Sequence, residues 1–76
     1  MKSQIFVTLK SGVLDPQGRA IQTALTGLGF TGVADVRAGK LIEIEHDDRV
    51  TDEMLDDMCR KLLANIVIEN YRIERG

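Results

Sequence analysis

Residues 4–18, QIFVTLKSGVLDPQG, predict a strand followed by the start of a helix. Ile5, Val7 and Leu9 alternate with the side chains of the opposite face, which is the period-2 pattern of a β-strand. Phe6 breaks the pattern because it places a large apolar group on that opposite face. We therefore expect both faces of this strand to be covered.

The helix expected next begins with Asp15 and Pro16, since aspartate caps a first turn and proline fits the first helical position. Gly29 suits the left-handed residue that ends many helices, and Phe30 is then expected to pack back on Leu25. Apolar residues recur between these ends at the spacing of one helix face. They are Ile21, Ala24, Leu25 and Leu28.

The rest of the chain predicts two short strands at residues 33–37 and 41–46, a second helix from Thr51, and a last strand at residues 67–74. Ala38-Gly39-Lys40 separates the two short strands, and a glycine with positive φ makes a hairpin there the expected connection. The order strand–helix–strand–strand–helix–strand predicts a single α+β domain with ferredoxin-like topology. Both helices are expected on one face of an antiparallel sheet.

Composition excludes several classes of function. The formal net charge is −2 and both signs are dispersed, whereas a nucleic-acid-binding protein usually has a basic face. No apolar run approaches the roughly 20 residues that a membrane span needs, and no apolar segment typical of a signal peptide begins the chain. We expect a cytoplasmic protein that binds neither nucleic acid nor membrane.

A domain of 76 residues has a small core, and one core of that size rarely supplies more than about 3–5 kcal/mol. Cys59 is the only cysteine, so no internal disulfide adds stability. Self-association is the expected additional support, as a homodimer or a higher oligomer. Apolar side chains that one sheet face cannot accommodate are the predicted dimer contacts, namely Phe6, Tyr71 and Ile73.

Several stretches resemble motifs of active or binding sites, but the residues around each one do not fit such a site. GLGFTG at residues 27–32 matches G-x-G-x-x-G but follows a helix, whereas a dinucleotide site needs these glycines before a helix. Cys59 falls on an apolar helix stripe, and His46 has no sequence neighbour that would make it a catalytic base. The acidic residues 47–57 lack the spacing of a calcium loop. We predict no catalytic, cofactor-binding or metal-binding residue.

Three segments in order resemble the PurS family, the small subunit of phosphoribosylformylglycinamidine (FGAM) synthase. The first is VTLK with VLDPQG at residues 7–18, and the second is DVR, GK and IEI at residues 35–44. The third runs from MCRKLLAN to VIENYRIE at residues 58–74. Ile66 departs from the family pattern, which usually has proline there.

The resemblance implies a non-catalytic role in de novo purine biosynthesis. In that enzyme a synthetase subunit, PurL, uses ATP and magnesium to convert formylglycinamide ribonucleotide to formylglycinamidine ribonucleotide. A glutaminase subunit, PurQ, supplies ammonia from glutamine. The family member is expected to link these two subunits as a dimer and to aid ammonia transfer, with no cofactor of its own.

Contact with those partners is predicted for Arg37, Gly39 and Lys40, because two cations at a hairpin tip would meet carboxylates or phosphate on another subunit. The alternative is that Gly39 serves only the turn and both cations are merely solvated.

Two other functions share the predicted topology. One is a regulatory module of the ACT type that binds an amino acid. Such modules have a turn that contains glycine and proline, and residues 15–18 loosely resemble that turn. The other is a small enzyme of the acylphosphatase type, but residues 11–14 supply no cation for its phosphate loop. Topology alone does not decide among the three.

Overall fold

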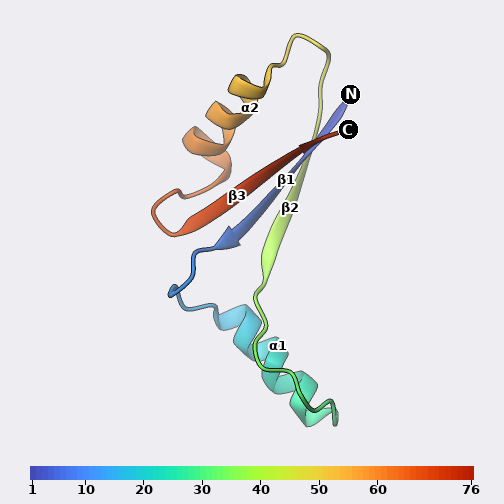
Figure 1. The fold of residues 1–76 in the computed structure, drawn as a ribbon, viewed down its shortest axis with the longest axis vertical. Coiled ribbons are helices and arrows are strands. Elements are labelled where there is room, and N and C mark those ends of the chain that lie inside the picture. The colour runs from blue at the N-terminus through green and yellow to red at the C-terminus, as the bar shows by residue number, and fades with distance from the viewer.

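A computed structural model describes all 76 residues and confirms the α+β class with an antiparallel sheet (Figure 1). The strands number three, one fewer than expected. In chain order the elements are β1 (Lys2–Leu9), α1 (Pro16–Gly27), β2 (Gly39–Glu45), α2 (Asp52–Met58), a π-helical turn η1 (Cys59–Leu63) and β3 (Glu69–Arg75).

The central strand of the sheet is β1, with β2 on one side and β3 on the other. Ile5 lies opposite Ile42 and Ile73 in the two antiparallel ladders. Ile5 and Val7 are almost completely buried, because their face of the sheet is covered by α2 and η1. The alternating pattern at residues 4–10 therefore predicts the central strand correctly.

The helix that covers this face begins at Thr51, whose hydroxyl accepts a hydrogen bond from Met54 N at 3.2 Å. Beyond Met58 the helix widens into η1, where Ala64 N donates to Cys59 O over five residues. The wider turn places both Cys59 and Ala64 in the core and rotates Leu62 outward, so that Leu62 is 83% exposed. An apolar stripe with uniform helical spacing would have placed Leu62 inside.

The expected strand at residues 33–37 and the hairpin after it are wrong. Residues 28–38 return alongside α1 without forming a strand. Their backbone groups bond to α1 and its cap instead of to a sheet: Gln22 Nε2 donates to the carbonyls of Val33 at 3.4 Å and Ala34 at 3.1 Å, and Asp15 accepts from Ala38 N. Because these three backbone groups are bonded to α1 and its cap, they are not available to pair with β2.

The expectation that both helices lie on one face of the sheet is also wrong. Only α2 lies on the sheet, whereas α1 projects past the end of the strands (Figure 1). The radius of gyration is 15.6 Å, against about 11 Å for a compact chain of this length. The apolar stripe of α1 is consequently open to solvent, with Ile21 39% and Leu28 74% exposed. Neither helix combines the length and the apolar character of a membrane-spanning helix.

The end of α1 follows the sequence prediction. Phe30 N donates to Leu25 O and Gly29 N donates to Thr26 O, both at 3.1 Å, and Gly29 has a φ of 94°. These are the two backbone bonds of a Schellman motif. The Phe30 side chain nevertheless stays largely exposed.

Candidate interaction surfaces

Two chain segments join α1 to the sheet, and Arg37 bridges them. We call α1 together with residues 28–36 the arm, and the two joining segments, residues 9–15 and 37–39, the waist. Arg37 donates from Nη1 to Val13 O at 3.1 Å and from Nη2 to Lys10 O at 3.1 Å and Leu9 O at 3.5 Å. Arg37 therefore does not lie on a hairpin tip as expected, and its guanidinium is bonded within the chain. The side chain is exposed, and its contact with another subunit stays a prediction.

Asp15 forms a second bridge at the waist. Its Oδ1 accepts from Gly18 N at 2.8 Å, which confirms the predicted helix cap, and its Oδ2 accepts from Ala38 N at 2.7 Å. The bond from Gly18, then the bond from Ala38 and the charge of Arg37, hold the pKa of Asp15 below its ordinary value. Asp15 is thus held as a carboxylate that joins the start of α1 to the start of β2.

Gly39 and Lys40 occupy the first two positions of β2, opposite Thr8 and Val7. Gly39 does not have the positive φ expected of a turn residue. A Cβ at this position would lie 2.5 Å from Val7 O, so the close approach of β1 requires the glycine. Lys40 is exposed, and contact of Lys40 and Gly39 with another subunit stays a prediction.

Phe6 lies on the opposite sheet face from Ile5 and Val7, as the alternation predicts, and is half-buried there. The Arg72 guanidinium stacks over its ring at 4.4 Å from the centroid, and Leu41 is its direct neighbour on β2. Part of the cover expected for this face thus comes from the chain itself. A dimer contact at Phe6 stays a prediction.

Tyr71 and Ile73 pack against the core beneath α2 and are half-buried in the single chain. The Tyr71 hydroxyl donates to Asp56, which also pairs with Arg60 at 2.9 Å. The bond to Asp56 and partial burial raise the pKa of Tyr71. Their packing within the chain leaves these two side chains little free surface, and a dimer contact through them stays a prediction.

A shallow apolar groove, which we call the α2 groove, lies along α2 and β2 with a cavity volume of about 440 Å³. Asp57 and Lys61 stand at this groove as its only charged residues. Its apolar lining consists of Ile44, Met54, Met58, Leu62 and Leu63. The α1 stripe and the α2 groove are thus two of the apolar surfaces that the molecule exposes.

Cys59 and His46, the two residues considered for catalysis, have surroundings typical of residues with a structural role. Cys59 is completely buried, and burial, followed by the charge of Asp56, raises the pKa of its thiol. His46 Nε2 lies 2.7 Å from Ser3 Oγ, and His46 Nδ1 lies 2.7 Å from Asp47 O. Ser3 has no exposed surface, so a substrate does not reach the Ser3 hydroxyl. Sequence reasoning missed the pair because only the β1–β2 register brings Ser3 near His46.

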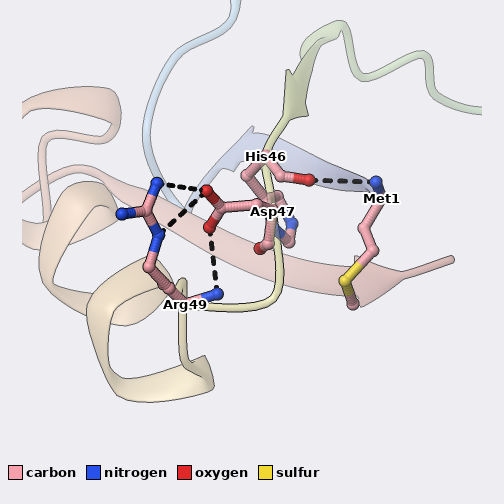
Figure 2. A network of polar contacts seen from close by, with 4 residues as sticks. All are labelled: Met1, His46, Asp47 and Arg49. Carbon is pink, nitrogen blue, oxygen red and sulfur yellow. Dashed lines mark hydrogen bonds and ion pairs between the residues drawn. The ribbon is translucent and has the colours of Figure 1, made fainter.

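Further polar contacts link residues at the same end of the sheet (Figure 2). The Met1 ammonium donates to His46 O at 2.9 Å, and Arg49 Nη2 lies 2.6 Å from Asp47 Oδ2. The side chain of Arg49, followed by its backbone N–H, holds the pKa of Asp47 below its ordinary value. Nowhere do three His, Cys, Asp or Glu side chains gather in a way that could hold a metal ion.

Comparison with known proteins identifies the family. The family model described as PurS, phosphoribosylformylglycinamidine (FGAM) synthase, matches residues 2–75. The PurS subunit of this synthase from Bacillus subtilis (strain 168) is 52% identical over 75 residues, which cover 96% of this chain and 89% of the relative. This chain belongs to the PurS family. It is therefore a subunit of FGAM synthase, non-catalytic itself, in purine biosynthesis.

Solved structures of the PurS family have the same fold. PurS of Methanocaldococcus jannaschii superposes with a TM-score of 0.84 at 44% identity, covering 96% of this chain and 92% of that one. A chain in the structure of PurLQS from Thermotoga maritima superposes with a TM-score of 0.80 at 30% identity, covering 96% and 93%. Membership of the PurS family decides against the amino-acid-binding module and the acylphosphatase-type enzyme.

Proposed function

We propose that this chain links the synthetase PurL and the glutaminase PurQ in FGAM synthase and supports transfer of ammonia between them. The likeness to a chain of the Thermotoga maritima PurLQS structure over 96% of the sequence carries the proposal. The burial of Ser3 and Cys59 supports a role without catalysis, because the two candidate nucleophiles do not meet solvent. ATP and magnesium are then used by the synthetase partner, and the complex works in the cytoplasm.

Reconstitution tests this function. PurL and PurQ are purified from one organism, and ATP-driven formation of formylglycinamidine ribonucleotide is measured with glutamine or with ammonium chloride as the nitrogen source. Addition of this chain should restore the glutamine-dependent rate and leave the ammonia-dependent rate nearly unchanged. A glutamine-dependent rate that is equal with and without the chain would contradict the proposal.

We further propose that the working unit is a homodimer that forms through α1. An amphipathic helix normally buries its apolar stripe against another layer, and the α1 stripe meets no layer of its own chain. The α2 groove is an apolar surface of the same chain that also lacks cover. Two copies related by a two-fold axis would bury such surfaces reciprocally and would present two equivalent faces to larger partners.

Sedimentation at micromolar concentration measures this association. A mass of twice 8.4 kDa or more is expected, whereas a stable monomer across the range would contradict the homodimer. The measurement is independent of PurL and PurQ, so it separates the dimer from the linking role.

A further inference from the structure

We propose that Asp15 and Arg37 are positioning residues for assembly, because their hydrogen bonds across the waist fix the direction in which the arm leaves the sheet. The inference rests on the proposed homodimer through α1. It assigns to Arg37 a role within the chain.

The arm is one internally bonded unit. Gly18 of α1 lies so close to the returning segment that a Cβ on it would stand 2.2 Å from Val36 O. Gln22, one turn further along, donates to the carbonyls of Val33 and Ala34. Because α1 is hydrogen-bonded to its returning segment through Gln22 and lies in close contact with it at Gly18, the two move together, and the waist sets their orientation relative to the sheet.

Arg37 provides the first of the two waist contacts. One guanidinium reaches the carbonyls of Leu9, Lys10 and Val13, so it holds the end of β1 and the loop that follows it. The planar fork of arginine bonds several carbonyls at once, whereas the single ammonium of lysine does not reproduce that geometry. Fixing this loop fixes the point at which α1 begins.

Asp15 provides the second contact, and its two carboxylate oxygens have separate tasks. Oδ1 caps α1 through Gly18 N, and Oδ2 holds Ala38 N, the residue before β2. Asparagine caps a helix about as well as aspartate, but its amide nitrogen does not accept a hydrogen bond. Asp15→Asn therefore removes the waist contact and keeps the helix cap.

The direction of α1 matters for association, because a small rotation at the waist displaces the far end of the helix by several ångströms. A helix of 12 residues is about 18 Å long, so a rotation of about 20° at the waist moves its far end by about 6 Å. Side chains in a packed interface do not tolerate a displacement of that size. An arm with a loose waist would present the same apolar stripe in the wrong place.

The experiment uses the full chain and four conservative variants. Asp15→Asn and Arg37→Lys disturb the waist, while Asp35→Asn and Arg19→Lys are matched controls at exposed residues near the same waist. Residual dipolar couplings of backbone amides report the orientation of α1 relative to the sheet. Sedimentation equilibrium reports the dimer Kd, and circular dichroism reports retained helix.

The two waist variants should keep their helix content, lose the single α1 orientation found in the wild type, and weaken the dimer by about tenfold or more. The controls should stay within about twofold of the wild type. Unchanged couplings and Kd in both waist variants would overturn the proposal. A wild-type chain that is monomeric would overturn the homodimer, and the couplings alone would then decide whether the waist fixes the arm.

Discussion

The sheet half of the molecule, which consists of the three strands, α2 and η1, differs from the arm in how much apolar surface it buries. Of the seven buried residues, Gly18 alone lies in the arm, and all the others belong to β1, α2, η1 or the residue that follows η1. Yet both helices carry an apolar stripe. The difference shows that helical periodicity predicts that a surface will be buried but does not predict which part of which chain will bury it.

The contrast is tested most strongly by truncation in the two halves. Ile5→Ala removes a completely buried side chain from the centre of the sheet and should lower the free energy of unfolding by about 2–5 kcal/mol. Leu28→Ala removes an exposed side chain at the far end of α1 and should change it by less than about 0.5 kcal/mol. Urea denaturation in dilute solution, where self-association does not contribute, measures both. Similar losses in the two variants would mean that the arm packs on its own sheet.

A charge in the α1 stripe should separate folding from association. Ile21→Asp places a carboxylate on the stripe and should weaken the dimer by about 30-fold or more, since burial of one such side chain contributes roughly 2 kcal/mol. The sheet should keep its stability, because α1 does not pack on it. Sedimentation and urea denaturation of the same samples measure the two effects.

Phe6→Asp is the matched comparison on the outer face of the sheet. If Phe6→Asp dissociates the dimer and Ile21→Asp does not, the interface lies on the sheet as the sequence alone suggested, and the assignment to α1 is wrong.

Local rules predicted the parts of the fold that local physics decides. The alternation at residues 4–10 gave the central strand, and Asp15 and Gly29 marked the two ends of α1. These features depend on neighbours within a few residues, so a single sequence contains the information.

The errors involve choices between competing partners. Residues 33–37 have a strand-like composition, but Gln22 and Asp15 bond the backbone of the returning segment and keep it beside α1. The acceptors of Arg37 are backbone carbonyls more than 20 residues away, which no motif encodes. The candidate surfaces were harder to predict than the fold for the same reason, since they depend on where the arm points.

Acid should weaken the contact that Asp15 makes at the waist. The pKa of Asp15 is lowered in the folded chain from its usual 3.8, so its carboxylate stabilises the fold above that value. This contribution is lost as the pH falls through the lowered pKa. The stability gap between the wild type and Asp15→Asn should therefore be constant from about pH 5 to 7 and shrink below about pH 4. Thermal unfolding across this range measures it, and a gap that widens on acidification would contradict the role of the carboxylate.

The smallest effect is expected on the outer face of the sheet, where Arg72 covers Phe6. Arg72→Ala should lower the free energy of unfolding by about 0.5–1 kcal/mol, the usual size of an exposed cation–π contact. The ion pair of Arg72 with Glu74, at 3.5 Å between exposed side chains, should add little.

A double-mutant cycle of Arg72→Ala with Phe6→Leu isolates the stacking energy from the ion pair. A coupling near zero would leave Phe6 without effective cover in its own chain, and the outer face would then need a second copy as much as the arm does. A coupling of the expected size means that the sheet half covers Phe6 within one chain, so the α1 stripe is the surface that most needs a partner.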